Sequence, residues 1–317
     1  MVHRHPTASP EDSPHRSAGK DRKRKRSVIT LDDFASLVYL PHIEMRKRSW
    51  SLDERILRQH ISPVFGARKL AGIERQDVED WLCGLSSGGL APATCNRALS
   101  VFKTLCHEAA LRGFMPAGQS PCASVSPLKV HTLRERYLTK EEAQKLMRRL
   151  EQSIRPEAGA LRLLLLTGAR KNEILRARWE NGRTDLRLLI VPLSKSGRPR
   201  HIPLSEAAVA VLRALPRVPG SPWLFPGKAP EKPLSDLYLF WNRIRRELGL
   251  DGVRIHDLRH SYASFLVNSG HSLYEVQKLL GHSDPRTTMR YAHLGQAQLL
   301  AAAETVSSCL RSSSGEK

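Results

Sequence analysis

Cysteine is scarce in this 317-residue sequence, and long hydrophobic runs are absent from it. The five cysteines include no C-x-x-C pair, so their spacing indicates neither a disulfide framework nor a zinc ribbon. The longest apolar runs, at 163–166 and 188–193, fall far short of the ~20 residues that span a bilayer. The first residues also lack the apolar segment of a secretory signal. We therefore expect a cytoplasmic protein with reduced thiols and no membrane partner.

Acidic residues are few relative to basic ones. The sequence has 51 Lys and Arg against 31 Asp and Glu, which leaves a formal net charge of +20. Residues 1–27 hold eight basic and three acidic side chains, a net charge of +5, so +15 remains in the rest of the chain. Surplus positive charge at this density usually faces a polyanion, most often the phosphate backbone of a nucleic acid. A basic surface that serves only solubility is the alternative.

Four amphipathic stretches within residues 28–115 predict a small all-helical domain. Thr30 is placed to cap the first stretch, and Ser51 with Glu54 has the spacing of a capping box at the start of the second. Pro92 suits the first turn of the fourth stretch. Because hydrophobic residues make up 40% of the sequence, ordinary cores can be buried here and beyond.

The second half of the chain is mostly helical and contains one expected β-hairpin. Thr139 and Glu142 form a further capping box, and residues 161–167 are apolar throughout, as in a buried helix. β-like runs at 185–193 and 199–204 flank a polar tip. Further helices are expected at 206–215, 235–248, 257–269 and 273–280. Since no βαβ alternation is present, we predict a mainly α fold with a small antiparallel β-sheet.

Several common enzyme motifs are missing from the sequence. It contains no P-loop and no G-x-G-x-x-G, H-E-x-x-H or G-x-S-x-G pattern. His256 and His260 have a spacing that metal-binding histidine pairs use, but a third spaced histidine and carboxylate ligands are missing. We therefore expect no metal and no other cofactor.

The sequence has instead a series of phosphate-seeking side chains near the ends of expected elements. Arg170 follows Gly168 after the apolar helix, and His256 and Arg259 lie about one turn apart at the start of another helix. Lys195 lies in the tip of the hairpin. Taken singly, such residues are usually caps, packing residues or solvated surface groups.

In their order and spacing, these residues resemble the tyrosine recombinase family, which includes phage integrases and Xer-type recombinases. The resemblance rests on HDLRHSYA at 256–263, LLGH at 279–282 and TTMRYAH at 287–293. TGAR at 167–170 looks like the first arginine box of the family, and SKSGRPRHIPL at 194–204 looks like its lysine hairpin. The similarity extends over about residues 30–300.

The resemblance implies a division of the chain in which a helical, SAM-like core-binding domain that contacts DNA precedes a catalytic domain. The expected parts are a disordered basic arm at 1–27, the core-binding domain at 28–115, a linker at 116–135, the tyrosine recombinase catalytic domain at 136–300 and a C-terminal tail at 301–317.

The resemblance also implies that Tyr291 attacks a DNA phosphate and forms a 3′-phosphotyrosyl link, while Arg170 and Arg259 bind the non-bridging oxygens. Physical chemistry agrees with these roles. Two planar, always charged guanidiniums neutralise the growing negative charge on the phosphate, so that neither a metal nor ATP is required. A tyrosine with a pKa of ~10 needs a base or nearby cations to act as a nucleophile.

The remaining roles implied by the family concern proton transfer and support. Lys195 would protonate the leaving 5′ oxygen, and His256 would help to deprotonate Tyr291. His282 would add a hydrogen bond to the phosphate. Glu173 would support the site without touching DNA.

The function expected from this resemblance is site-specific recombination or integration of double-stranded DNA, as in enzymes of mobile elements. The expected assembly is a homo-tetramer on two DNA sites, with hetero-partners left open as an alternative, and without a small-molecule substrate. Two alternatives stay open: a catalytically silent DNA-binding protein of the same fold, and a DNA-relaxing enzyme similar to type IB topoisomerases.

Overall fold

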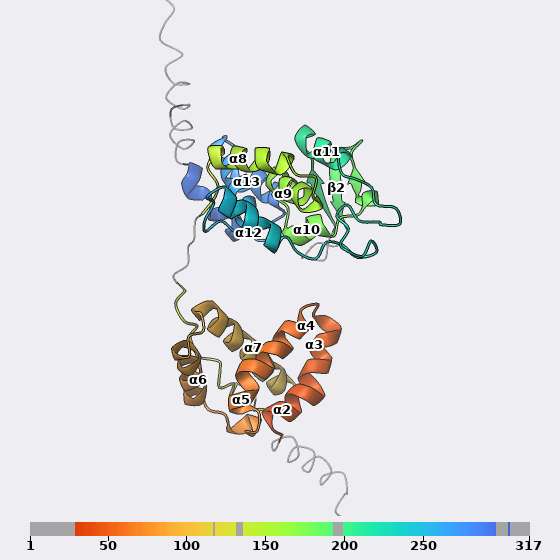
Figure 1. Ribbon diagram of the computed structural model, residues 1–317. Coiled ribbons are helices and arrows are strands. Elements are labelled where there is room, and N and C mark those ends of the chain that lie inside the picture. The colour runs from red at the N-terminus through yellow and green to blue at the C-terminus, as the bar shows by residue number, and fades with distance from the viewer. Residues whose placement is uncertain (1–28, 117, 131–135, 193–198, 296–303, 305–317) are drawn as a thin grey trace, which may run out of the picture. The chain divides into compact units, whose positions relative to one another are not determined.

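A computed structural model of the chain describes residues 29–116, 118–130, 136–192, 199–295 and 304. The chain divides into two compact units, Met1–Leu133 and Arg134–Lys317, which run from red to olive and from green to blue in Figure 1. Each unit has its own buried hydrophobic core. Within the described residues, no helix is long and apolar enough to cross a membrane.

In its described residues, the first unit has four segments that contain α-helix, as the sequence predicts, and a 3₁₀ turn at Leu70–Gly72. The first segment is α2 (Leu31–Phe34), which a π-helical stretch joins to α3 (Leu40–Arg46). The second is α4 (Trp50–Ile56), which another π-helical stretch joins to α5 (Ser62–Phe65). The third and fourth are α6 (Arg75–Ser87) and α7 (Pro92–Leu111). Thr30 caps α2, since its side chain accepts a hydrogen bond from the backbone N–H of Asp33 at 3.1 Å. Phe65, Trp81 and Phe102 pack together in the core with ring centroids 5.0–5.8 Å apart.

One predicted helix start in this unit is wrong. The sequence places a capping box at Ser51 and Glu54, whereas α4 begins at Trp50 and has Ser49 as its N-cap, without a side-chain capping bond. The carboxylate of Glu54 instead accepts a hydrogen bond from Nε of Arg58 at 3.1 Å, one turn further along the helix. A favourable i, i+4 ion pair thus competes with the cap for the same carboxylate.

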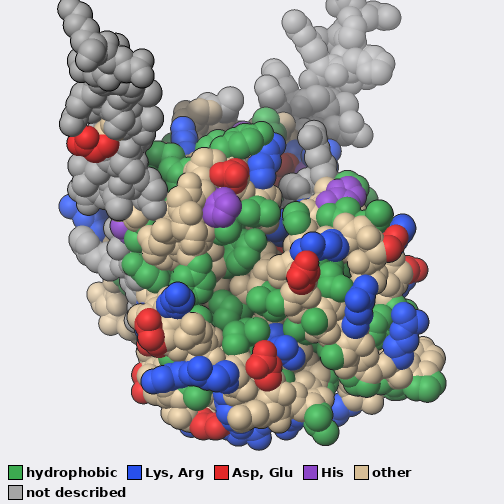
Figure 2. Space-filling model, turned by 90° about the horizontal axis from the view of Figure 1, so that it is seen from above, with side chains coloured by type: hydrophobic (Ala, Val, Ile, Leu, Met, Phe, Trp, Pro, Cys, Tyr) green, Lys and Arg blue, Asp and Glu red, His purple; other side chains and the backbone are tan. Residues whose placement is uncertain are grey.

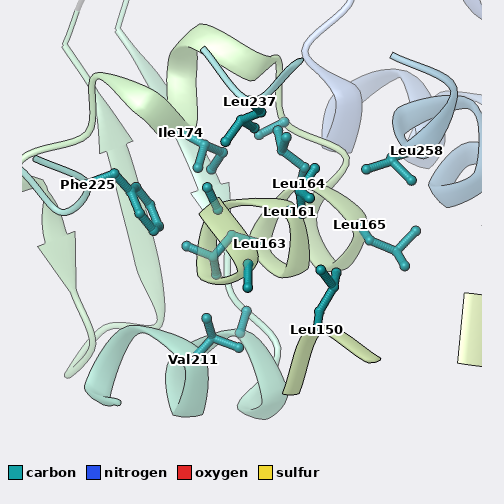
Figure 3. Close-up of a cluster of buried hydrophobic side chains, with 14 of the residues drawn as sticks. Leu150, Leu161, Leu163, Leu164, Leu165, Ile174, Val211, Phe225, Leu237 and Leu258 are labelled. Atoms are coloured by element: carbon teal, nitrogen blue, oxygen red, sulfur yellow. The ribbon is translucent and has the colours of Figure 1, made fainter. Parts of the chain in front are cut away.

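The second unit is built around α9 (Pro156–Thr167), the apolar helix that the sequence predicts. α8 (Lys140–Glu151) precedes it and begins with the predicted capping box. In this box the Thr139 hydroxyl accepts a hydrogen bond from the backbone N–H of Glu142, and the Glu142 carboxylate accepts one from the backbone N–H of Thr139. Figure 3 shows leucines of α9 surrounded by side chains from several other elements. This central helix ends at Gly168, where the candidate site begins.

The small sheet of this unit is antiparallel and has the strand order β1 (Gly182–Arg183), β2 (Leu188–Val191) and β3 (Arg200–Pro203). β2 and β3 pair with Val191 opposite Arg200, so the predicted hairpin strands are confirmed. The residues of β3 alternate between buried and exposed positions, and Arg200 and Ile202 take the buried ones.

Further helices complete the second unit. They are α10 (Lys171–Leu175), α11 (Glu206–Arg213), α12 (Tyr238–Glu247), α13 (Asp257–Asn268), α14 (Leu273–Leu280) and α15 (Arg286–Met289), with short 3₁₀ turns at Trp179–Asn181 and Ala292–Gly295. The predicted fold class, mainly α with a small antiparallel sheet, is therefore confirmed.

Charged side chains of both signs cover much of the surface. On the face shown in Figure 2, Lys and Arg side chains are interspersed with Asp, Glu and hydrophobic ones. Many basic groups are paired locally, as in Arg183 with Asp185 at 2.8 Å, where both side chains are about half exposed. Pairs of this exposed kind contribute little to stability.

Candidate active site

Arg170 lies at the junction of α9 and α10, where the chain turns sharply. Gly168 ends α9 with a φ of 61°, a left-handed conformation that glycine adopts without steric cost. A Cβ atom at this position would also lie 2.4 Å from the ring of Tyr262. The backbone N–H of Arg170 donates to Oε2 of Glu173 at 2.8 Å, and Nη1 of the Arg170 side chain donates to Oε1 of Glu173 at 2.9 Å. Glu173 thus holds Arg170 through both main chain and side chain.

Arg259 lies in the first turn of α13 and is only 4% exposed. Its Nη1 donates to the carbonyl oxygen of Gly168 at 2.7 Å, and its Nη2 donates to that of Leu280 at 2.8 Å. Burial is the largest cause that lowers the pKa of Arg259, and the charges of Arg170 and Arg200 add to it and bring the value to about 10. This side chain therefore stays cationic at neutral pH. A guanidinium has five N–H groups, and two bonds to carbonyls leave donors for a ligand.

The C-terminus of α14 holds three arginines together. The bonds run from Nη2 of Arg200 to the carbonyl oxygen of Leu279 at 2.6 Å, from Nη2 of Arg259 to that of Leu280 at 2.8 Å, and from Nη2 of Arg170 to that of Gly281 at 3.1 Å. The last carbonyls of a helix lack partners within the helix and carry its negative partial charge. Three successive carbonyl oxygens therefore bind three cations that would otherwise repel one another.

Arg200 is a site residue that the sequence analysis did not identify. It is 8% exposed, its Nη1 donates to Oε2 of Glu173, and Glu173 therefore lies between two guanidiniums. Burial alone would raise the pKa of Glu173, but Arg200 and then Arg170 lower it overall, so this carboxylate is ionised. Alternate residues of a strand face the core, and a charged residue at such a position is rarely buried without a partner. An arginine at a core-facing position of the predicted strand is therefore the sequence signal that could have revealed Arg200.

Gly281 completes this arrangement at the end of α14. It has a φ of 65°, and a Cβ atom there would lie 2.4 Å from Nε of Arg200. The glycine therefore allows both the turn of the chain and the close approach of the arginine.

His282 follows the turn at Gly281 and is half-buried. Its Nδ1 is hydrogen bonded to Oγ1 of Thr288 at 2.8 Å, which fixes the orientation of the ring. Burial, followed by the charges of Arg259 and Arg170, lowers the pKa of His282 to about 4. The imidazole is therefore neutral at physiological pH.

Tyr291 follows α15 and is buried, with 6% of its surface exposed. Its hydroxyl is hydrogen bonded to Nδ1 of His260 on α13 at a distance of 2.5 Å. Burial raises the pKa of Tyr291, although the charges of Arg290 and Arg259 act in the opposite direction. The phenol is therefore protonated in the free protein.

His256 is the N-cap of α13 and lies one turn before His260, and of the two it is His260 that is hydrogen bonded to the tyrosine. Their rings meet edge to face with centroids 4.9 Å apart. Within the described residues, no hydrogen bond joins His256 to Tyr291. Burial, followed by the charge of Arg259, lowers the pKa of His256. The described residues also contain no group of three or more His, Cys, Asp or Glu that could hold a metal ion.

Comparison with known proteins matches both units to one family. Residues 136–298 match the model of the phage integrase family, and residues 36–86 match the phage integrase N-terminal SAM-like domain. The chain is 30% identical to the tyrosine recombinase XerC of Xanthomonas campestris over an alignment of 238 residues, which covers 72% of each chain. The chain belongs to the phage integrase family of tyrosine recombinases.

Further relatives and solved structures agree with this assignment. The recombinase is 27% identical to the tyrosine recombinase XerD of Pasteurella multocida over 73% of its own length and 81% of the relative's. A lambda integrase dimer bound to a core site superposes with a TM-score of 0.69 at 21% identity, covering 83% of this chain and 95% of that one. The integrase of transposon Tn1549 gives a TM-score of 0.67 at 18% identity, with the same coverage of both chains. The recombinase therefore shares their fold.

The recombinase is accordingly an enzyme of the tyrosine type that acts in site-specific recombination. Of the residues that the sequence analysis selected, Arg170, Glu173, Arg259 and His282 converge on the C-terminus of α14. The positive charge of Arg259 acts on Tyr291 and opposes the rise that burial causes in the pKa of its hydroxyl. The position of Lys195 lies outside the described residues, as do most of the expected tail and the whole of the expected arm at 1–27.

Proposed function

We propose that the recombinase cleaves and rejoins double-stranded DNA through a 3′-phosphotyrosyl intermediate at Tyr291. One observation carries this proposal: Arg170 and Arg259 are anchored on adjacent carbonyls at the end of α14, and the charge of Arg259 acts on Tyr291, whose hydroxyl is hydrogen bonded to His260. The site thus combines two guanidiniums held in fixed positions with an oriented nucleophile.

The two arginines bind the scissile phosphate. A phosphodiester monoanion repels nucleophiles, and its transition state gathers further charge on the non-bridging oxygens. Guanidiniums held in place before the reaction stabilise that charge without reorganising. His282 adds a hydrogen bond from its ring, which Thr288 orients.

Cleavage exchanges one phosphoester bond for another. Oη of Tyr291 forms a bond to phosphorus, and the bond from phosphorus to the 5′ oxygen breaks. That oxygen is a strong base as an alkoxide, so Lys195 acts as the general acid that protonates it. The phosphotyrosyl link conserves the energy of the broken bond, and the 5′ hydroxyl of another strand reverses the step without ATP.

Strand exchange between two duplexes requires four tyrosines, and therefore four copies of this chain. Lambda integrase has been described as a tetramer bound to a Holliday junction, and the Tn1549 integrase in complex with DNA of a circular intermediate. The homo-tetramer proposed here assembles on two DNA sites. The arm at 1–27 adds positive charge to the DNA-binding surface.

Replacement of Tyr291 by phenylalanine tests the proposal. The variant keeps the ring and its packing but loses the attacking oxygen, so DNA binding should stay within a fewfold of wild type and no covalent adduct should form. Adducts are measured on denaturing gels with a nicked suicide substrate that traps the cleaved strand. An adduct that persists in the Tyr291→Phe variant would show that another residue is the nucleophile.

Tyr274→Phe is the matched control, because this tyrosine is 64% exposed on α14 and its variant should cleave normally. The same substrates separate the alternative functions. A wild-type protein that binds DNA but never forms an adduct is a silent DNA-binding protein. One that relaxes supercoiled DNA without joining two sites is a relaxing enzyme.

A further inference from the structure

We propose that His260 takes the phenolic proton of Tyr291 during cleavage and returns it during religation. The proposal rests on the function proposed above, in which Tyr291 is the nucleophile. It assigns to His260 the step that the family resemblance gives to His256.

The geometry of α13 carries this inference. Nδ1 of His260 lies 2.5 Å from the hydroxyl of Tyr291, within the range of a direct hydrogen bond between the two atoms that exchange the proton. The rings of the two residues have centroids 5.9 Å apart and planes inclined by 52°. His256 packs with its ring edge to face against that of His260 instead, which limits rotation of the His260 side chain.

The proton transfer balances as follows. The Oη–H bond of Tyr291 breaks as the Oη–P bond forms, and the proton moves to Nδ1 of His260, which becomes a cation. The 5′ oxygen leaves with a proton from the general acid. In religation a 5′ hydroxyl attacks phosphorus and gives its proton back to the general acid, and His260 returns its own proton to Oη as the phosphotyrosyl bond breaks. His260 must therefore be neutral before cleavage begins.

The surroundings of His260 keep it neutral. Burial, followed by the neighbouring His256, lowers the pKa of His260 to about 4. The titratable and charged groups that face it are Asp257 on its own helix, His256 at the N-cap of that helix, Arg254 before it, and Arg290 and Tyr291 after α15. Among these, Asp257 acts in the opposite direction and raises the pKa.

A base this weak accepts a phenolic proton only when the phenol becomes acidic. That condition is met in the reaction, because the phenolic oxygen loses its basicity as it bonds to phosphorus. The bound phosphate also brings a negative charge to the site, which raises the pKa of a nearby histidine. The transfer is therefore expected to accompany the attack on phosphorus and not to precede it.

Single-turnover cleavage by His260→Gln and His256→Gln variants tests the assignment. Glutamine fills a similar volume and can hydrogen bond to the tyrosine, but it cannot accept a proton. His260→Gln should slow cleavage by roughly 10²–10⁴-fold at pH 7, as expected when a general base is lost. DNA binding should stay within a fewfold of wild type. His271→Gln, whose side chain is 46% exposed at the start of α14, controls for the loss of a histidine as such.

The pH profile distinguishes a proton acceptor from a packing residue. Without its base, Tyr291 must lose its proton to hydroxide, so the ratio of the His260→Gln rate to the wild-type rate should rise about tenfold per pH unit above neutrality. A purely structural defect would give a ratio that does not depend on pH. If His256→Gln shows the rising ratio and His260→Gln does not, His256 is the acceptor and the proposal is wrong.

Chemical rescue provides a second readout that does not depend on the behaviour of glutamine. His260→Ala opens a space beside the tyrosine hydroxyl, and added imidazole should restore cleavage in proportion to its neutral form. Failure of imidazole to rescue a variant that binds DNA normally would contradict the proposal. If the wild-type protein forms no adduct at Tyr291, the proposed function itself fails, which is a different outcome.

Discussion

At the scale of single residues, the site depends on charges that are buried close together. Arg170 and Arg200 share one carboxylate, Glu173, whereas Arg259 donates only to backbone carbonyls. The excess positive charge of the three arginines is balanced by carbonyl dipoles and by the expected DNA phosphate. Such an arrangement favours an incoming anion, because the protein supplies more positive charge than it neutralises.

The geometry of Arg259 predicts that lysine cannot replace it. A single ammonium cannot bind the carbonyls of Gly168 and Leu280 together and still present a planar pair of donors to a phosphate. Arg259→Lys should therefore reduce the rate of single-turnover cleavage by roughly 10²–10³-fold, as for loss of a transition-state donor. Arg183→Lys, in an exposed ion pair, should cleave at the wild-type rate. Near-normal cleavage by Arg259→Lys would contradict the bidentate role.

The neutral histidines predict how stability depends on pH. The pKa of His282 is lowered from 6.5 to about 4, so between these values the unfolded chain binds a proton that the folded chain does not. The free energy of unfolding should therefore rise with pH from about 4 to 6.5, by less than ~1.4 kcal/mol per pH unit for this residue.

Urea denaturation at several pH values measures this slope. His282→Gln should flatten it, because a glutamine takes up no proton in the unfolded chain. His271→Gln serves as the comparison at an exposed position. An unchanged slope in His282→Gln would show that His282 is protonated in the folded state.

At the scale of elements, α14 organises the site through its two ends. Its N-terminus is closed locally by Ser272 and Glu275, which form a capping box. Its C-terminus is closed by arginines from the junction of α9 and α10, from α13 and from β3, and thus by residues distant in sequence. The helix therefore sets the spacing of the proposed phosphate-binding groups.

Arg200→Met tests the contribution of this closure. The variant leaves the carbonyl of Leu279 without its guanidinium and removes one of the two arginine partners of Glu173. The free energy of unfolding should fall by about 2–4 kcal/mol, somewhat less than for a fully broken buried pair, because Arg170 still neutralises Glu173. Arg183→Met should change it by less than about 1 kcal/mol, as is usual for an exposed pair. A loss as small as in Arg183→Met would mean that Arg200 does not stabilise this helix end.

At the scale of the whole molecule, the net charge of +20 predicts strongly salt-dependent DNA binding. Each phosphate neutralised by Lys or Arg releases counterions, so log K should fall linearly with log salt, with a slope of about −0.9 per contact. Gel shifts or anisotropy between 50 and 300 mM salt (roughly the range in which such slopes are measured) should give a steep line. Deleting residues 1–27, which carry +5, should make it shallower. A salt-insensitive complex would contradict binding through phosphates.

The sequence alone determined those features that depend on near neighbours along the chain. The capping box at Thr139, the apolar run of α9 and the β-like runs of the hairpin all act within a few residues, so helices and strands could be predicted from them. The order of the motifs along the chain likewise indicates the family that the matched family model shows. The start of α4 was missed because two local bonds compete for one carboxylate.

Only the tertiary structure decided which of these residues touch. Arg170 and the carbonyl of Gly281 are 111 residues apart in sequence, and no local pattern reveals that three arginines share one helix end. His256 and His260 lie on the same side of α13, so spacing could not tell which of them reaches the tyrosine. That contact depends on how the segment after α15 packs against α13, and this packing is set by long-range burial instead of local propensity.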